Sequence, residues 1–175
     1  MSAFPTSAIA VSNYFVDCAG RDPGARALDQ LKLQKLGYYA YGWYAANQHK
    51  PLFEDDIKAW KLGPVIETVY GRFKRFGRGT ITEREYDVSF EGGKAVWTMP
   101  TVQDDALQRY LDKVWNVYRD LSGVQLSNMS HEAGGPWDTV WRASSGSGDQ
   151  LIPYELISSY FAEKLQAHKE PPLVP

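Results

Sequence analysis

The chain has 175 residues, of which 43% are hydrophobic, 23% charged and 14% aromatic. This length favours one domain with its own core and is short for two. The formal net charge of −2 provides no global attraction to nucleic acid or to an anionic membrane, so neither partner is expected. Cys18 is the only cysteine, which excludes an intrachain disulfide and a cysteine-rich metal cluster.

The apolar stretches predict a soluble, cytoplasmic protein. The N-terminal residues carry no basic leader, and Ser12, Asn13 and Asp17 interrupt the apolar run, so no signal peptide is expected. The longest uncharged run that contains aromatic residues, Leu36 to Gln48, is shorter than the roughly 20 apolar residues of a membrane span. No residue pattern demands a cofactor, and the three histidines lack metal-ligand spacing.

Helical patterns dominate the first half of the chain. Thr6 or Ser7 can cap a first helix, which ends at Asp22-Pro23-Gly24. A second helix is expected from about Ala25 to Gln48. Because its second half is apolar nearly all round, this helix should be central and buried.

The segment "EDDIKAWKLGPVIETVY", Glu54 to Tyr70, has a helical pattern at both ends and Gly63-Pro64 in its middle. Pro64 lacks an N–H and disfavours helical geometry at the residue before it. We therefore predict two short helices, Glu54 to Leu62 and Pro64 to Phe76, joined at a fixed angle. The second is expected to bury Val65, Val69 and Phe73, with Ile66 and Tyr70 beside them.

Near residues 80–99 the apolar period changes to two. Two alternating runs flank Gly92-Gly93, which suits a two-residue hairpin turn. The predicted register pairs Glu91 with Lys94, Phe90 with Ala95, Val88 with Trp97 and Tyr86 with Met99. One apolar face and one pair of opposite charges agree with this β-hairpin.

The remaining sequence predicts four more helices. The first begins at Asp104-Asp105, and Ser122-Gly123-Val124-Gln125 has the spacing of a capping box for the second. Pro136 and Pro153 open the last two. The predicted fold is therefore mainly α: a single domain of about seven helices over residues 1–170, with one β-hairpin near residues 80–99 and a disordered tail at 171–175.

Three side chains of uncommon placement are candidates for partner binding. Lys35 lies in the apolar stripe of the second helix, where its stem must reach water or its ammonium must find a carboxylate. Extension to water is the usual outcome, and a partly buried lysine in a recognition site is the alternative. Trp60 and Trp137 adjoin the two Gly-Pro turns, and tryptophan there either packs in the core or serves an interface.

Two further readings of the sequence concern catalysis and nucleic acid. His131-Glu132 is the one acid–imidazole neighbourhood suited to a general base, although His131 also fits the end of a helix. Cys18 on an apolar helix face fits the core better than a nucleophile. The run Arg72 to Arg78 is basic with interleaved aromatics, which suits a DNA-binding autoregulator or, alternatively, a helix C-terminus with favourable cations.

Three segments resemble one known family. "LKLQKLGYYAYGWYAANQHKPLFEDDIKAWKLGPVIETVYGRF", Leu31 to Phe73, is similar to the long first motif of the Panacea domain, the SocA-like antitoxin domain also found in phage-associated proteins. "LSNMSHEAGGPW", Leu126 to Trp137, resembles its second motif, and "LIPYELISSYF" resembles its closing helix. The resemblance spans about residues 28 to 165.

The resemblance implies an antitoxin rather than an enzyme: a protein that binds and neutralises a cognate protein toxin, in some members as an adaptor to a protease. It falls on Lys32, Gln34, Lys35, Tyr39, Trp43, Trp60, Gly63, Pro64, Val65, Tyr70, His131, Pro136 and Trp137. The first candidates for toxin contact are Lys35, Trp60, His131 and Trp137. Gly63, Pro64, Val65, Tyr70 and Pro136 are expected to serve the structure of the motif.

Gly37 departs from the family pattern, which has a bulky apolar residue at this position. A glycine within a helix costs about 1 kcal/mol relative to alanine. We therefore expect a neighbour, a Trp or another stretch of backbone, to lie closely over it. The hairpin falls in a stretch that varies between members, and its edges are candidates for strand pairing with a partner.

Overall fold

A computed structural model describes residues 4–167 of the chain. Its helices are α1 (Ala8–Arg21), α2 (Gln30–Gln48), α3 (Glu67–Phe73), α4 (Asp105–Tyr118), α5 (Gly123–Ser130), α6 (Pro136–Ala143) and α7 (Tyr154–Ala167), with a 3₁₀ turn η1 (Lys74–Phe76). Its strands are β1 (Ile57–Trp60), β2 (Gly63–Ile66), β3 (Asp87–Glu91), β4 (Lys94–Thr98) and β5 (Gln150–Leu151). The mainly helical class and the hairpin are confirmed; the expected tail at 171–175 lies outside the described residues.

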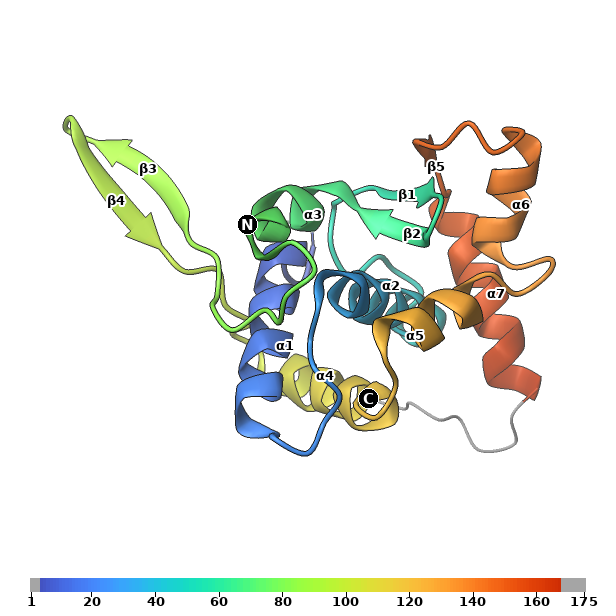
Figure 1. Cartoon of the computed structure of the whole chain (residues 1–175), viewed down its shortest axis with the longest axis horizontal. Coiled ribbons are helices and arrows are strands. Elements are labelled where there is room, and N and C mark those ends of the chain that lie inside the picture. Colours follow the sequence, from blue (N-terminus) through green and yellow to red (C-terminus); the bar gives the residue numbers. More distant parts are fainter. Residues whose placement is uncertain (1–3, 168–175) are drawn as a thin grey trace.

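Helix α2 lies at the centre of the molecule and packs against α1, α4, α5 and α7 (Figure 1). Every residue from Lys32 to Ala46 is buried, and for the second half of the helix this is what the apolar pattern predicts. The helix begins at Gln30, later than expected, because the Asp29 side chain caps it by accepting a 2.7 Å hydrogen bond from the Lys32 N–H. The preceding Leu28 is held outside the helix, where its carbonyl oxygen accepts from the Ile81 N–H at 2.7 Å.

Two glycines let other elements approach α2 closely. A Cβ atom on Gly37 would lie 2.7 Å from Cδ1 of Ile66, so the expected close neighbour exists, although it is an isoleucine side chain. A Cβ on Gly42 would overlap the ring of Phe161, which belongs to α7. The two glycines therefore allow β2 and α7 to pack directly on the central helix.

The prediction of two helices around Gly63-Pro64 is wrong. Residues 57–66 form the antiparallel β1–β2 hairpin, with Ile57 opposite Ile66 and Trp60 opposite Gly63. Along β1, buried Ile57 and Ala59 alternate with half-buried residues, which is the period of a strand. Helix α3 begins only at Glu67. Of the residues expected to be buried after Pro64, four are, whereas Tyr70 is 41% exposed.

Pairing partners explain this outcome. Strand β5 adds to the other edge of β1, with Lys58 opposite Leu151, to give a sheet of order β2-β1-β5. Gly63 adopts φ +102, a value that suits the turn and not a helix. A four-residue alternation is too short to distinguish a strand from a helix in sequence.

The β3–β4 hairpin follows the predicted register, from Asp87 opposite Thr98 to Glu91 opposite Lys94. Gly92 and Gly93 take φ +57 and +78 in the turn, as a two-residue hairpin requires. The hairpin projects away from the helical body (Figure 1). Its apolar face therefore lies in solvent instead of covering a second layer.

The second half of the chain follows the predicted pattern of helices. Ser122 and Gln125 form both hydrogen bonds of the capping box at the start of α5, and Pro136 is the first residue of α6. Within residues 4–167, no helix is both long enough and apolar enough to cross a bilayer.

Candidate partner-binding site

The motif residues of α2 hold other segments of backbone. Lys32 Nζ donates to the carbonyl oxygens of Arg26 and Arg119, at 3.0 and 2.6 Å. Gln34 accepts from the Ile66 N–H at 2.7 Å. Both side chains are buried, so this part of the motif anchors the loops and β2 to the central helix.

Lys35 has the same kind of contact and no carboxylate partner among the described residues. Its side chain is 0% exposed, so the expected extension of its stem to water is wrong. Its Nζ atom donates a 2.9 Å hydrogen bond to the Pro64 carbonyl oxygen. Because burial penalises the charged ammonium, the pKa of Lys35 falls to about 7.

Gly63 lies directly against this lysine. A Cβ atom at this position would be 2.6 Å from Oγ of Ser130 and 2.9 Å from Cε of Lys35. The Ser130 hydroxyl donates to the Ser127 carbonyl oxygen at 2.7 Å, and the Ser127 hydroxyl donates to the Leu62 carbonyl oxygen at 2.7 Å. The β1–β2 turn is thus fixed between α2 and α5.

The other three candidates meet at the same turn. Trp137 Nε1 donates to the Trp60 carbonyl oxygen at 2.7 Å, and the His131 ring stacks on Trp137 with 3.8 Å between centroids. Trp137 is buried at 7% exposure, whereas Trp60 and His131 are half-buried. The structure therefore brings all four predicted residues to one place, where Trp60 and His131 reach the surface.

The environment of His131 favours the neutral form of its ring. Burial lowers its pKa, the nearby charge of Lys35 lowers it further, and Asp138 acts in the opposite sense. Within the described part of the chain, its buried Nε2 has no hydrogen-bond partner. Glu132, the expected acid partner, instead accepts from Tyr160 and from Lys164, so the acid–imidazole pair of a general base is not formed.

Tyr70, expected as a structural residue of the motif, extends the surface next to Trp60. The two rings meet edge to face at 5.1 Å between centroids. The other structural residues of the motif are buried: Val65 is 6% exposed, Pro64 lies in β2, and Pro136 is the first residue of α6. The candidate site thus has a buried frame and a small aromatic exterior.

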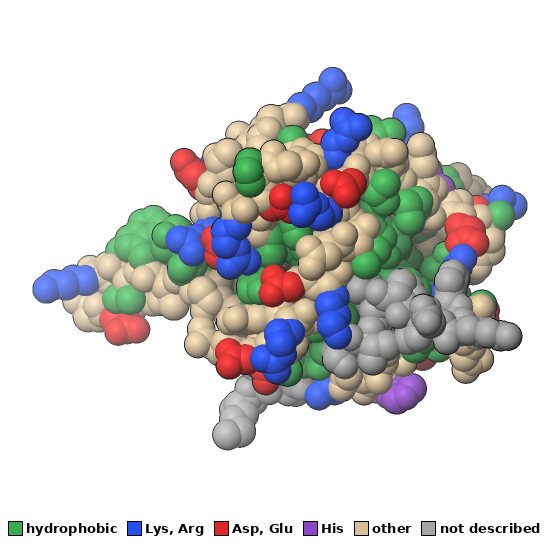
Figure 2. Space-filling model, turned by 90° about the horizontal axis from the view of Figure 1, so that it is seen from below, with side chains coloured by type: hydrophobic (Ala, Val, Ile, Leu, Met, Phe, Trp, Pro, Cys, Tyr) green, Lys and Arg blue, Asp and Glu red, His purple; other side chains and the backbone are tan. Residues whose placement is uncertain are grey.

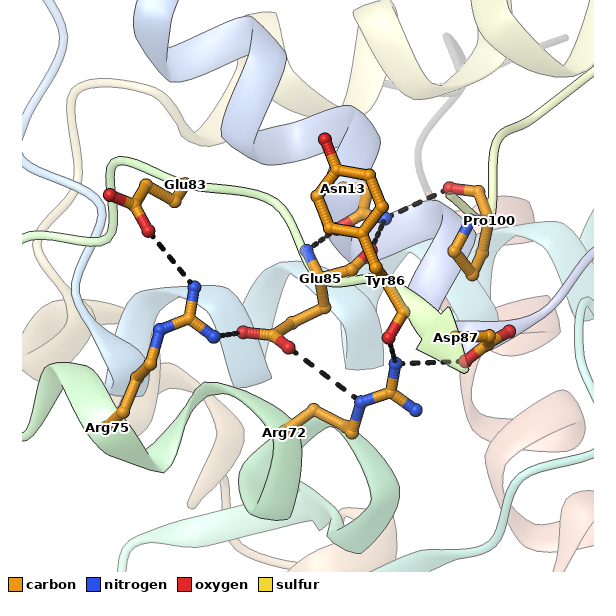
Figure 3. Close-up of polar contacts among 8 residues, drawn as sticks. All are labelled: Asn13, Arg72, Arg75, Glu83, Glu85, Tyr86, Asp87 and Pro100. Carbon is orange, nitrogen blue, oxygen red and sulfur yellow. Dashed lines mark hydrogen bonds and ion pairs between the residues drawn. The ribbon is translucent and has the colours of Figure 1, made fainter. Parts of the chain in front are cut away.

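Ion pairs engage the basic run Arg72 to Arg78 at the base of the β3–β4 hairpin (Figure 3). Arg72 pairs with Glu85 at 3.8 Å and with Asp87 at 2.9 Å. Arg75 pairs with Glu85 and, at 3.3 Å, with Glu83. Two of the cations expected to face DNA are therefore neutralised within the protein.

A buried asparagine joins both legs of that hairpin. Asn13 on α1 accepts from the Glu85 N–H and donates to the Glu85 carbonyl oxygen, both at 2.9 Å, and donates to the Pro100 carbonyl oxygen at 3.0 Å. This role was not predicted from the sequence. The signal available was a polar side chain, Asn13, within the apolar run of the first helix.

These features define a mainly helical domain with a buried polar frame around a β-turn and a projecting hairpin. The comparisons with known proteins give this class its family: residues 33–138 match the family described as Antitoxin SocA-like, Panacea domain. The chain is also 32% identical over 146 residues to Antitoxin SocA of Caulobacter vibrioides, across 81% of this chain and 72% of that protein. No solved structure matches at a significant level. The chain belongs to the SocA-like Panacea family.

Proposed function

We propose that this protein is an antitoxin that binds and neutralises a cognate protein toxin by forming a stoichiometric complex. The observation that carries the proposal is its 32% identity to Antitoxin SocA over 81% of the chain. Family membership over residues 33–138 supports an antitoxin role in the same direction.

The arrangement of titratable groups favours binding over the hydrolase alternative. His131 stacks on Trp137 and lacks its carboxylate, while Glu132 is held by Lys164 at 2.7 Å. Cys18 is buried, and burial raises the pKa of its thiol to about 11, which disfavours a nucleophilic thiolate at neutral pH.

Within this proposal, Lys35, Trp60, His131 and Trp137 act together at the β1–β2 turn. Trp60 and His131, which are half-buried, contact the toxin directly. Lys35 and Trp137 support that surface through their hydrogen bonds to the carbonyl oxygens of Pro64 and Trp60. Tryptophan is frequent among residues that dominate binding energy, which agrees with a contact role for Trp60.

Growth rescue tests the antitoxin role. Expression of the protein encoded by the neighbouring reading frame should arrest growth, and co-expression of this chain should restore it. Failure to restore growth at equal expression would contradict the proposal. Delivery of the toxin to a protease, the second mode that the family resemblance implies, predicts that the toxin's half-life falls on co-expression. Simple blocking leaves that half-life unchanged.

A further inference from the structure

The β3–β4 hairpin is a free-standing element with an uncovered apolar face. Of its strand residues, all but the half-buried Val96 are exposed. Figure 2 shows hydrophobic side chains gathered along this projection, beyond the helical body. A lone two-stranded hairpin is marginal in water, and an apolar cluster on such an element indicates an interaction surface.

The pairing register defines the composition of this face. Val88 lies opposite Trp97, and Phe90 lies opposite Ala95, so these side chains share one face, and Tyr86 joins them by alternation. The exposed fractions are 76% for Phe90, 67% for Trp97, 46% for Tyr86 and 43% for Val88. Asp87, Ser89, Glu91, Lys94, Val96 and Thr98 belong to the opposite, largely polar face. The hairpin thus has one apolar face and one largely polar face, and both are mainly exposed.

The base of the hairpin is rigidly held. Asn13 hydrogen-bonds the backbone of Glu85 and of Pro100, which enter and leave the hairpin. The Glu85 carboxylate, with its side chain 11% exposed, pairs with Arg72 and Arg75 from the other side (Figure 3). A surface that is held in position before binding loses less conformational entropy when the complex forms.

The area of the face favours a different protein over a second copy of this chain. From the exposed fractions and the usual area of aromatic side chains, the face offers on the order of 500 Å². Two copies joined through it would bury about 1,000 Å² in total, less than the roughly 1,200–2,000 Å² of a stable interface. A partner whose groove receives the hairpin can contact more than this one face.

A cavity next to the hairpin supplies additional contact area. It has a volume of about 860 Å³ and lies between α1 and the hairpin base, with Tyr86 and Trp97 in its lining. Its charged lining includes Arg21, Arg84, Asp17 and Glu83, so both signs are present. A partner with an apolar groove and a polar rim would fit the face and the cavity together.

We propose that the β3–β4 hairpin is the arm that inserts into an apolar groove of the cognate toxin, with Phe90 and Trp97 as its anchors. The inference rests on the proposed antitoxin function and adds a second toxin contact to the one proposed for Trp60 and His131 at the β1–β2 turn. The arm contributes aromatic contact area, and the fixed base determines its orientation.

The test is a titration of the full chain with the purified protein encoded by the neighbouring reading frame. The double variant Phe90→Ala/Trp97→Ala should weaken binding by about 100-fold or more, as loss of two central aromatic anchors does. Its melting temperature should match that of the wild type, since both side chains are exposed. The matched control is Ser89→Ala/Val124→Ala, which changes the opposite face and a 62% exposed valine on α5, and its affinity should not change.

The outcomes separate this inference from the function on which it rests. If the wild type forms no complex, both fail. If the wild type binds and the double variant binds equally well, the proposed role of the hairpin is wrong and the antitoxin function stands. A wild-type dimer that the double variant abolishes, with unchanged toxin affinity, would assign the face to a second copy. As an independent readout, amide hydrogen exchange across residues 87–98 should slow in the complex. Unchanged exchange would contradict the proposed contact between the hairpin and the toxin.

Discussion

The ammonium of Lys35 lies wholly buried beneath the β1–β2 turn, where it donates a 2.9 Å hydrogen bond to the Pro64 carbonyl oxygen. The adjacent Gly63 backbone leaves no space for a side chain between this lysine and Ser130. The buried Lys35 side chain thus anchors β2 to α2 through the Pro64 carbonyl oxygen. The relationship makes the stability of the site depend on pH.

The free energy of unfolding should rise as the pH increases from about 7 to about 9. The pKa of Lys35 is about 7 in the folded protein, below its usual 10.5, so the unfolded chain binds more protons in this range. A single group of this kind changes stability by at most about 1.4 kcal/mol per pH unit. Urea unfolding at pH 7, 8 and 9 measures the slope.

The variant Lys35→Met should flatten that slope. Lys32, whose pKa burial lowers to about 8, gives a smaller contribution that Lys35→Met leaves in place. Lys74→Met is the control, because it removes the charge of an exposed lysine. It should retain the full wild-type slope. Equal slopes for Lys35→Met and the wild type would contradict the buried position of this ammonium.

Gly63→Ala should destabilise the fold by about 2–4 kcal/mol, because it combines a strained φ of +102 with overlap against Ser130 and Lys35. Gly77→Ala is the matched control, since Gly77 has φ +56 and no atom lies within 4 Å of the place where a Cβ would stand. Its cost should be smaller, since it combines backbone strain with open space around the new Cβ. Equal losses in thermal unfolding would mean that the overlap at the turn is absent.

Asn13→Ala should cost about 2–3 kcal/mol, because it leaves the buried Glu85 N–H without its acceptor. Exchange of the Glu85 amide hydrogen should accelerate as the hairpin base loosens. Ser12→Ala removes a neighbouring buried hydroxyl, which within residues 4–167 bonds to the Ala8 carbonyl oxygen of the same helix at 2.8 Å. This variant should leave the exchange at Glu85 unchanged. Slow exchange at Glu85 in both variants would show that Asn13 does not fix the hairpin.

Trp137→Phe should retain the ring contact with His131 while removing the donor to the Trp60 carbonyl oxygen. The expected loss is about 2–3 kcal/mol, because the Trp60 carbonyl oxygen loses its donor and the buried indole loses part of its packing. Trp141→Phe is the control, since Trp141 also stacks on Trp137, at 5.3 Å between centroids, on the same helix. If the two variants lose equal stability, the hydrogen bond does not contribute as proposed.

Local signals in the sequence predicted much of the fold. The Ser7 and Ser122 caps, the Pro136 helix start and the Gly92-Gly93 turn act through residues near in sequence. The β1–β2 hairpin was missed because β5, which pairs with β1, lies much further along the chain. Its alternation covers only four residues, too few to outweigh a helical pattern on both sides.

The candidate site, too, was predictable only where the signal is local in sequence or lies in a family motif. The family motifs selected Lys35, Trp60, His131 and Trp137, and the structure places them together around one turn. The burial of Lys35 was not predictable, because it depends on the Pro64 carbonyl oxygen from another element. The hairpin register was predictable from alternation, whereas its exposure depends on the absence of a second layer, which no local pattern encodes.

The central claim is that this chain captures a protein toxin in a defined complex. Isothermal titration with the purified protein encoded by the neighbouring reading frame tests it most directly. We predict saturable binding with fixed stoichiometry and sub-micromolar affinity, of about −8 kcal/mol or stronger. Absence of heat and of a shifted sedimentation peak at about 10 μM of both proteins would contradict it.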